Sequence, residues 1–136
     1  MTCSRRWPVR PERIDTTTAI AIHDMQIDRH GGLPGIRDMG ALEACLAQPW
    51  GRFGGVDFYP SLEEKAARLA YEVITQHPFA DGNKRTGLAL MLVLLRAGGS
   101  PAVFDHGELY RVTLAVASGD MDYQGLLAFI RSSSSQ

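Results

Sequence analysis

H-P-F-A-D-G-N-K-R-T, residues 77–86, is a polar stretch that separates the two most regularly apolar segments of the chain. Pro78 disfavours the α conformation at the preceding residue, so a helix that starts near Ser61 is expected to end near His77. A second helix is expected from about Lys84 to Ala97, and its residues 88–95 are all apolar. Because a helix without a polar face is normally buried, this segment is predicted to be the central helix.

Start and stop signals delimit both helices. Ser61 and Glu64 have the spacing of a capping box, in which each side chain bonds the other residue's backbone N–H. Apolar residues then recur with a helical period, at Leu62, Ala66, Leu69, Ala70, Val73 and Ile74. The second helix is ended by Gly98-Gly99, and Pro101 enforces the stop.

Two further helices are expected towards the C-terminus. Asp105, followed by Glu108, starts a helix that reaches about residue 118. Asp120 or Asp122 caps a last helix. Residues 132–136 are polar, and they are predicted to be a disordered tail.

The chain before residue 61 predicts two more helices and a hairpin. Thr16 or Thr17 can cap a helix to about residue 30, and Asp38 can cap one to about residue 47. Residues 31–40 between them contain four glycines and must form a shaped loop. Residues 50–60, W-G-R-F-G-G-V-D-F-Y-P, are typical of a small hairpin or flap, which either covers the core or contacts a partner or substrate.

These elements predict a single all-α domain, a compact bundle of about six helices, over residues 14–131. A chain of 136 residues suits one such domain. Residues 1–13 have no period and are predicted to be a flexible N-terminal arm, either loosely ordered or docked through Trp7. His23 lies inside the first helix, where a structural or surface role is expected rather than a catalytic one.

The net charge of −1 gives no field that would attract nucleic acid or membranes, and a basic stripe is absent outside the arm. The longest apolar run has eight residues, whereas a membrane-spanning helix needs about 20. Cys3 and Cys45 lack metal-ligand spacing and indicate a reducing compartment. A cytoplasmic protein is therefore expected.

The start of the second helix has the character of an anion site. Asn83 is a good N-cap residue, which places Lys84 and Arg85 in the first turn. Cations there oppose the helix dipole at a cost of about 0.3–1 kcal/mol each, and Lys84 is one of only two lysines. The arrangement is explained if a phosphate binds the free N–H groups and both cations, with Gly82 allowing close approach. Alternatively, both side chains simply reach into solvent.

Two further residues favour the anion site. Asp81 supplies the single carboxylate that proteins usually contribute to a Mg²⁺ shell beside a phosphate. His77 lies across the loop and could accept a proton from an attacking hydroxyl. Phe79 is interpreted as an apolar pin that fixes the loop. The stretch lacks the first glycine of a Walker A loop, and His77 has no partner at zinc-ligand spacing.

The stretch resembles the motif of the Fic/Doc family. Residues 77–85 match the form H-x-F-x-[DN]-[AG]-N-K-R of the Doc (death on curing) branch, where Fic adenylyltransferases have glycine in place of Lys84. Residues 22–38, which include I-H-D and H-G-G-L-P-G-I-R-D, are similar to the N-terminal part of Doc-type toxins. The second arginine of many Fic motifs is replaced by Leu88.

The resemblance implies a Fic-type helical fold and a toxin of a type II toxin–antitoxin system. It implies His77 as general base, Asp81 as Mg²⁺ ligand, and Gly82, Asn83, Lys84 and Arg85 as binders of the nucleotide phosphates, with His77, Asp81, Lys84 and Arg85 as the catalytic set. Lys84 favours a kinase that transfers the γ-phosphate of ATP to a threonine of a translation factor such as elongation factor Tu. The alternatives are adenylylation of a protein, transfer of another phospho-group, or a catalytically idle binding module.

The chain lacks the inhibitory pattern [ST]-x-x-x-E-[GN] that restrains many Fic proteins. None of its six glutamates is followed by Gly or Asn, and none follows Ser or Thr by four residues. Inhibition is therefore expected from a second chain, a Phd-like antitoxin whose C-terminal segment binds a groove of the toxin.

Overall fold

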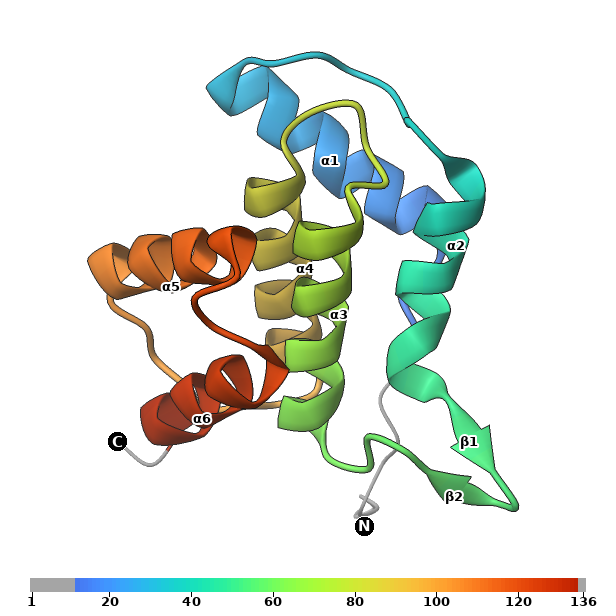
Figure 1. Ribbon diagram of the computed structural model, residues 1–136, viewed down its shortest axis with the longest axis vertical. Coiled ribbons are helices and arrows are strands. Elements are labelled where there is room, and N and C mark those ends of the chain that lie inside the picture. Colours follow the sequence, from blue (N-terminus) through green and yellow to red (C-terminus); the bar gives the residue numbers. More distant parts are fainter. Residues whose placement is uncertain (1–11, 135–136) are drawn as a thin grey trace, which may run out of the picture.

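In a computed structural model that describes residues 12–134, the chain forms a helical bundle with one small hairpin (Figure 1). The predicted all-α class and the hairpin are confirmed. In chain order the elements are α1 (Thr16–His30), α2 (Met39–Ala47), the 3₁₀ turn η1 (Gln48–Trp50), β1 (Arg52–Phe53), β2 (Val56–Asp57), α3 (Leu62–Gln76), α4 (Asn83–Ala97), α5 (His106–Ser118) and α6 (Tyr123–Ser134).

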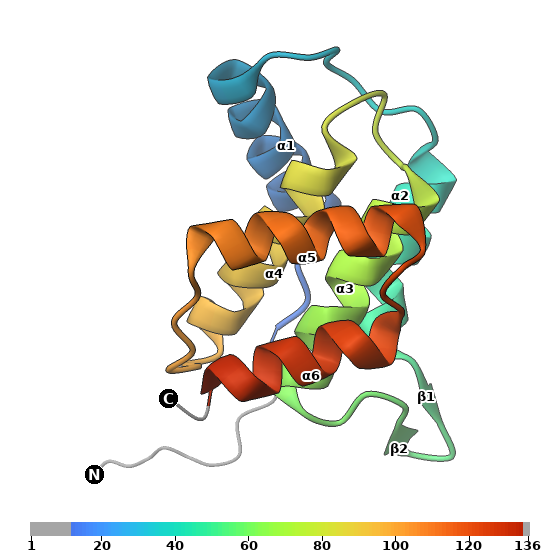
Figure 2. The ribbon, with the colours of Figure 1, turned by 60° about the vertical axis from the view of Figure 1, so that its left-hand side comes forward.

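The central helix is α3, and not the apolar segment that the sequence favoured. α3 contacts α2, η1, α4, α5 and α6. Figures 1 and 2 show α5 and α6 crossing one side of the α3–α4 pair, while α2 lies along α3. The buried residues of α3 are Lys65, Ala66, Ala67, Leu69, Ala70, Glu72, Val73 and Ile74.

The apolar helix α4 is buried on one face only. Leu90, Met91 and Leu94 are buried in the core, whereas Leu88 is half-buried and Val93 is exposed. Gly87 lets α4 approach α3, since a Cβ there would lie 2.8 Å from a side-chain carbon of Ile74 and 3.3 Å from a backbone oxygen of α3. Some of the apolar residues outside this face line a cleft. The hydropathy pattern does not distinguish residues that line a cleft from residues that fill the core.

Most of the predicted helix caps are confirmed, and two are corrected. Asp15 caps α1 instead of Thr16 or Thr17, because its carboxylate accepts from Thr18 N at 2.8 Å. Gly82 is the N-cap of α4, so Asn83 is the first helical residue and its side chain does not cap the helix. The capping box of α3 and the caps of α2, α5 and α6 are as predicted, at Ser61 and Glu64, Asp38, Asp105 and Asp122.

The hairpin is attached to the N-terminal end of α3 by a buried lysine. Lys65 is fully buried, and its Nζ donates to Asp57 Oδ2 at 3.1 Å and to the carbonyl of Tyr59. Arg52 pairs with the same carboxylate at 2.8 Å. Residues 77–83 follow the C-terminal end of α3 (Figure 1). At a rise of 1.5 Å per residue, the two ends of this helix are about 22 Å apart. The hairpin therefore does not lie beside the predicted active-site loop.

The two ends of the chain differ in part from the prediction. Most of the predicted flexible arm, residues 1–11, lies outside the described residues, and Ile14 just after it is buried. The predicted disordered tail is wrong for residues 132–134, which form the last turn of α6. The hydroxyls of Ser132 and Ser133 donate to Phe129 O within this turn. Within residues 12–134 no helix is long and apolar enough to cross a membrane.

Candidate active site

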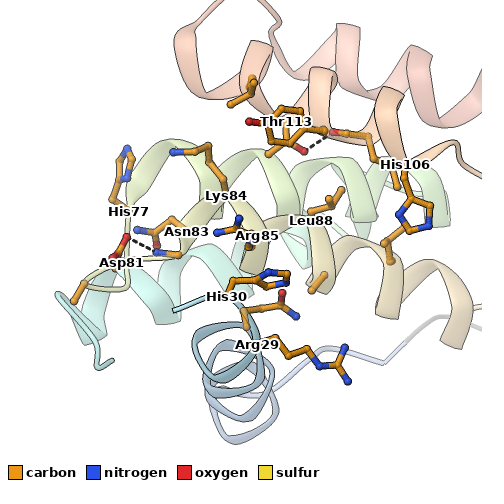
Figure 3. A pocket seen from close by; sticks show the side chains of 18 residues that line it. Arg29, His30, His77, Asp81, Asn83, Lys84, Arg85, Leu88, His106 and Thr113 are labelled. Carbon is orange, nitrogen blue, oxygen red and sulfur yellow. Dashed lines mark hydrogen bonds between the residues drawn. The ribbon is translucent and has the colours of Figure 1, made fainter. Parts of the chain in front are cut away.

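A cleft of about 680 Å³ lies between the loop before α4, α4 itself, α5 and the end of α1 (Figure 3). All six predicted catalytic and phosphate-binding residues line it: His77, Asp81, Gly82, Asn83, Lys84 and Arg85. Figure 3 shows His77, Asp81, Asn83 and Lys84 gathered at one end and His106 of α5 at the other. The structure therefore brings the predicted residues to one cavity, although it gives Asn83 a different local role.

His77 ends α3 in an unusual backbone conformation. Its φ of 52° and ψ of 58° are left-handed, and among residues 12–134 no other non-glycine residue has a positive φ. The left-handed conformation costs a residue with a Cβ about 1–2 kcal/mol. The exposed imidazole reaches the cleft from this turn. Strain of this kind persists only where surrounding contacts hold it, and it concentrates at functional sites.

Asp81 is an exposed carboxylate held by two backbone N–H groups. Its Oδ2 accepts from Leu33 N at 3.1 Å, and its Oδ1 accepts from Gly82 N at 2.9 Å. These hydrogen bonds lower the pKa of Asp81 below its ordinary value, and the charge of Lys84 adds to the effect. Gly32 beside it has a φ of 112°, which residues with a side chain rarely adopt, and a Cβ there would lie 2.8 Å from Asp81 Oδ2. The side chain is therefore a fixed anion at neutral pH.

Asn83 holds the shape of the loop through its side chain. Its Oδ1 accepts from Phe79 N and its Nδ2 donates to Phe79 O, both at 3.0 Å. Asn83 is buried, and both the oxygen and the nitrogen of its side-chain amide are hydrogen-bonded to the backbone of the turn. The predicted N-cap role was wrong because the left-handed Gly82, with a φ of 73°, already forms the cap position.

The ring of Phe79, which was predicted to fix the loop, is buried beneath it. It stacks on His23 with a centroid separation of 4.0 Å and an interplanar angle of 5°. His23 is 1% exposed, and its Nε2 donates to the carbonyl of Asp81 at 2.8 Å. The structural role expected for His23 is confirmed, but its contact with the active-site loop was not foreseen.

Lys84 and Arg85 project from the first turn of α4 and are exposed. No side chain caps this helix N-terminus, and within residues 12–134 neither cation is in an ion pair. Two cations, a helix start without a side-chain cap and the helix dipole therefore meet at one end of the cleft. This is the arrangement that stabilises a bound anion. One turn further, the half-buried Leu88 lines the cleft without adding charge.

The glycine-rich segment 31–38 supports the loop from outside. Ile36 pairs with Phe79 in an isolated antiparallel bridge, and Ala80 N donates to Gly35 O at 3.0 Å. Arg37 donates from Nε to His77 O at 2.5 Å and from Nη2 to Gln76 O at 2.8 Å. The glycines predicted a shaped loop, but no local pattern indicated which segment it packs against.

The cleft lining also contains apolar side chains and two further histidines. Leu92 of α4 and Leu109 and Leu114 of α5 line the cleft, as do His30 and His106. Figure 3 shows His106 at the end opposite His77 and Asp81, whereas His30 lies nearer to Arg85 and Leu88. The sequence singled out neither these two further histidines nor Leu92, Leu109 and Leu114 as part of a site. Their signal is weak, because apolar residues that line a cleft have the same spacing as those that fill a core.

The site fits a magnesium ion only in company with a phosphate. Among the described residues no cluster of three or more His, Cys, Asp or Glu side chains could hold a metal alone. Asp81 offers one ionised, exposed carboxylate beside the anion-binding end of the cleft. Mg²⁺ is commonly bound by one or two carboxylates, with substrate phosphates and water completing its shell. The donor set therefore suits Mg²⁺ that arrives with a nucleotide.

Comparison with known proteins shows the family of the chain. Residues 13–95, which include the whole loop and the support beneath it, match the model of the Fic/DOC family. The chain belongs to the Fic/DOC family. It is 36% identical over 112 residues to the "Protein kinase doc" of Escherichia phage P1, an alignment that covers 82% of this chain and 87% of that protein. It is 37% identical over 100 residues to the "Toxin Doc" of Mycolicibacterium smegmatis, covering 72% and 77% respectively.

Proposed function

We propose that the protein is a Doc-type toxin that acts as a protein kinase, transferring the γ-phosphate of ATP to a hydroxyl group of a target protein. Family membership and the similarity to a relative named as a protein kinase and another named as a toxin support this class. The observation that carries the proposal is that Lys84 and Arg85 lie at a helix start without a side-chain cap, in one cleft with the carboxylate of Asp81 and the imidazole of His77.

The residues divide the reaction between them. His77 accepts the proton of the acceptor hydroxyl as its oxygen bonds to the γ-phosphorus and the bond to the β-phosphate oxygen breaks, which releases ADP. The α4 N-terminus, with Lys84 and Arg85, binds the phosphates. Asp81 would hold Mg²⁺, which neutralises phosphate charge when it is bound. Gly82 and the backbone of Asn83 allow the phosphates to approach the helix, because the side-chain amide of Asn83 is engaged within the loop.

Lys84 and Leu88 favour phosphoryl transfer over adenylylation. Where Fic adenylyltransferases have glycine, Lys84 adds bulk and charge at the anion end of the cleft. Where many Fic motifs have a second arginine, Leu88 presents a half-buried apolar side chain to the same cavity. The cleft therefore has one strongly cationic end, suited to the phosphate that is transferred.

Labelled ATP distinguishes the two reactions. The protein is incubated with Mg²⁺, a candidate target and ATP labelled at either the α- or the γ-phosphorus. Label on the target from γ-labelled ATP alone is expected, and mass spectrometry should identify a phosphorylated threonine or serine. Label that appears only from α-labelled ATP would replace the kinase proposal with adenylylation, and no label with any target would favour a binding module.

A translation factor such as elongation factor Tu is the proposed target, and a cytoplasmic site of action follows from it. Expression of the protein should then arrest growth by blocking translation. A ribosome-programmed extract tests this directly. Translation should stop on addition of toxin and ATP, and it should resume when unmodified factor is added in excess.

The apolar lining of the cleft is the proposed binding region for the C-terminal segment of a Phd-like antitoxin. Leu92, Leu109 and Leu114 give the cleft an apolar lining, in which Leu92 is half-buried, Leu109 buried and Leu114 exposed, and the chain lacks an inhibitory glutamate motif of its own. A peptide from the cognate antitoxin should slow hydrogen exchange in α5 and compete with ATP. Binding that leaves both α5 exchange and ATP affinity unchanged would move the antitoxin site elsewhere.

A further inference from the structure

We propose that Arg37 is a positioning residue for His77: its guanidinium fixes the end of α3 in the conformation that directs the imidazole into the cleft. The inference rests on the proposed role of His77 as the general base. It adds to that role a residue on a distant loop, forty positions earlier in the sequence. Arg37 itself is not among the residues that line the cleft.

Arg37 donates hydrogen bonds to three successive backbone carbonyls at the end of α3. Its Nε donates to His77 O at 2.5 Å, and its Nη2 donates to Gln76 O at 2.8 Å. Its backbone N–H donates to Pro78 O, also at 2.8 Å. The planar guanidinium has N–H groups in a fixed fork, so these bonds set the orientation of two consecutive peptide groups together.

The chain next to α3 cannot supply these donors. A helix that ends in a left-handed residue is normally closed by N–H groups of the residues that follow. Here Pro78 has no N–H, Phe79 N donates to Asn83 Oδ1, and Ala80 N donates to Gly35 O. The carbonyls of Gln76 and His77 therefore rely on Arg37 among the described residues.

The position of Arg37 suits this role electrostatically as well. The C-terminal end of a helix carries a partial negative charge, so a cation that bonds its last carbonyls is favourable. The side chain is exposed, which means that its removal leaves a solvent-accessible gap instead of a buried cavity. Its loss should therefore free the backbone of His77 while the core stays packed.

Three variants test the proposal by kinetics. Arg37→Ala should lower kcat for phosphoryl transfer about 10- to 100-fold, because a displacement of about 1 Å at a reacting group can cost 10²-fold. The KM for ATP should change less than about threefold, since phosphate binding does not use Arg37. Arg37→Lys keeps the charge but not the fork, so it should remain nearly as slow as Arg37→Ala. Arg52→Ala, which removes an exposed arginine bonded to a carbonyl of the hairpin, is the matched control and should keep full kcat.

A backbone measurement separates this proposal from that of the kinase activity. In wild-type protein His77 should give the strong intraresidue Hα–HN NOE that a positive φ produces, and in Arg37→Ala this signal should weaken. Free guanidinium ion should partly restore both the NOE and kcat of Arg37→Ala. If wild type transfers no phosphate, or if His77→Ala still transfers it, the general-base role fails while the NOE still reports on Arg37.

Two results would overturn the positioning role. An Arg37→Ala variant that keeps both kcat and the His77 NOE would show that the loop holds itself. Full recovery of kcat by Arg37→Lys would show that only a positive charge is needed at the end of α3. Should Arg37→Ala fail to fold, Arg37→Lys still tests the fork, because it retains the charge and the aliphatic chain.

Discussion

The two lysines of the chain lie near opposite ends of α3 and have opposite environments. At the N-terminal end, Lys65 is completely buried and its Nζ is bonded to the Asp57 carboxylate and a carbonyl. At the C-terminal end, Lys84 stands exposed in the first turn of α4, with no anionic partner within 4 Å among residues 12–134. The first lysine is satisfied by the fold, whereas the second is available to a ligand.

The backbone shows the same contrast. α3 begins with a capping box that needs only Ser61 and Glu64, which are three residues apart. It ends at a left-handed histidine that depends on Arg37, forty residues earlier. Local contacts suffice where the helix only has to start. Long-range contacts are needed where the chain holds a strained residue at the edge of the cleft.

The largest effect is expected at His77. His77→Ala should lower the rate of phosphoryl transfer about 10²–10⁴-fold, the usual cost of losing a general base. The rate is measured with γ-labelled ATP and the target protein. Gln76→Ala, which removes the neighbouring exposed side chain but keeps its carbonyl, is the control and should leave the rate within twofold of wild type, an allowance of about 0.4 kcal/mol. A His77→Ala variant with the wild-type rate would assign proton removal to another group.

Lys65 tests the structural end of α3. Lys65→Met should lower the free energy of unfolding by about 3 kcal/mol, the low end for breaking a buried ion pair, because Arg52 still pairs with Asp57. Urea unfolding followed by circular dichroism measures the change. The kcat of the fraction that remains folded should equal that of wild type. A folded variant with reduced kcat would mean that the two ends of the helix are coupled.

Lys84 is the matched test at the other end. Lys84→Ala should raise the KM for ATP about 10- to 100-fold, as expected for losing a charge-assisted hydrogen bond worth about 1.5–3 kcal/mol. The free energy of unfolding should rise slightly or stay constant, because removing the cation relieves its opposition to the helix dipole. Titration with ATP and urea unfolding measure the two quantities. A loss of stability as large as that of Lys65→Met would contradict the assignment of Lys84 to a ligand.

The smallest effect is expected from the titration of Asp81. Its pKa in the folded protein lies below the ordinary value of 3.8, so the ionised carboxylate stabilises the fold above that pH and loses this contribution as the pH falls through the folded pKa. Wild type should therefore be more stable than Asp81→Asn at pH 6, and the difference should shrink towards pH 3. Thermal unfolding at several pH values between these limits measures it. A difference that does not depend on pH would mean that the carboxylate charge is not what binds Leu33 N and Gly82 N.

The sequence predicted the helices well because their signals are local. Ser61 with Glu64, Asp38 and Asp105 cap helices through residues three positions away, and Pro78 ends α3 as expected. The predictions failed where two local candidates competed. Asp15 was preferred to the neighbouring threonines, and Gly82 was preferred to Asn83. Which neighbour caps a helix depends on backbone geometry that composition does not contain.

The sequence by itself determined which polar groups the loop contains, since residues 77–85 place an imidazole, a carboxylate and two cations within nine positions. It also determined the all-helical class through the periodicity of its apolar residues. The tertiary structure alone decided that α3 is central, that part of the apolar α4 lines a cleft, and that His23 and Arg37 support the loop. The physical reason is range: caps and turns act within a few residues, whereas burial and long-range hydrogen bonds exist only after distant segments have packed together.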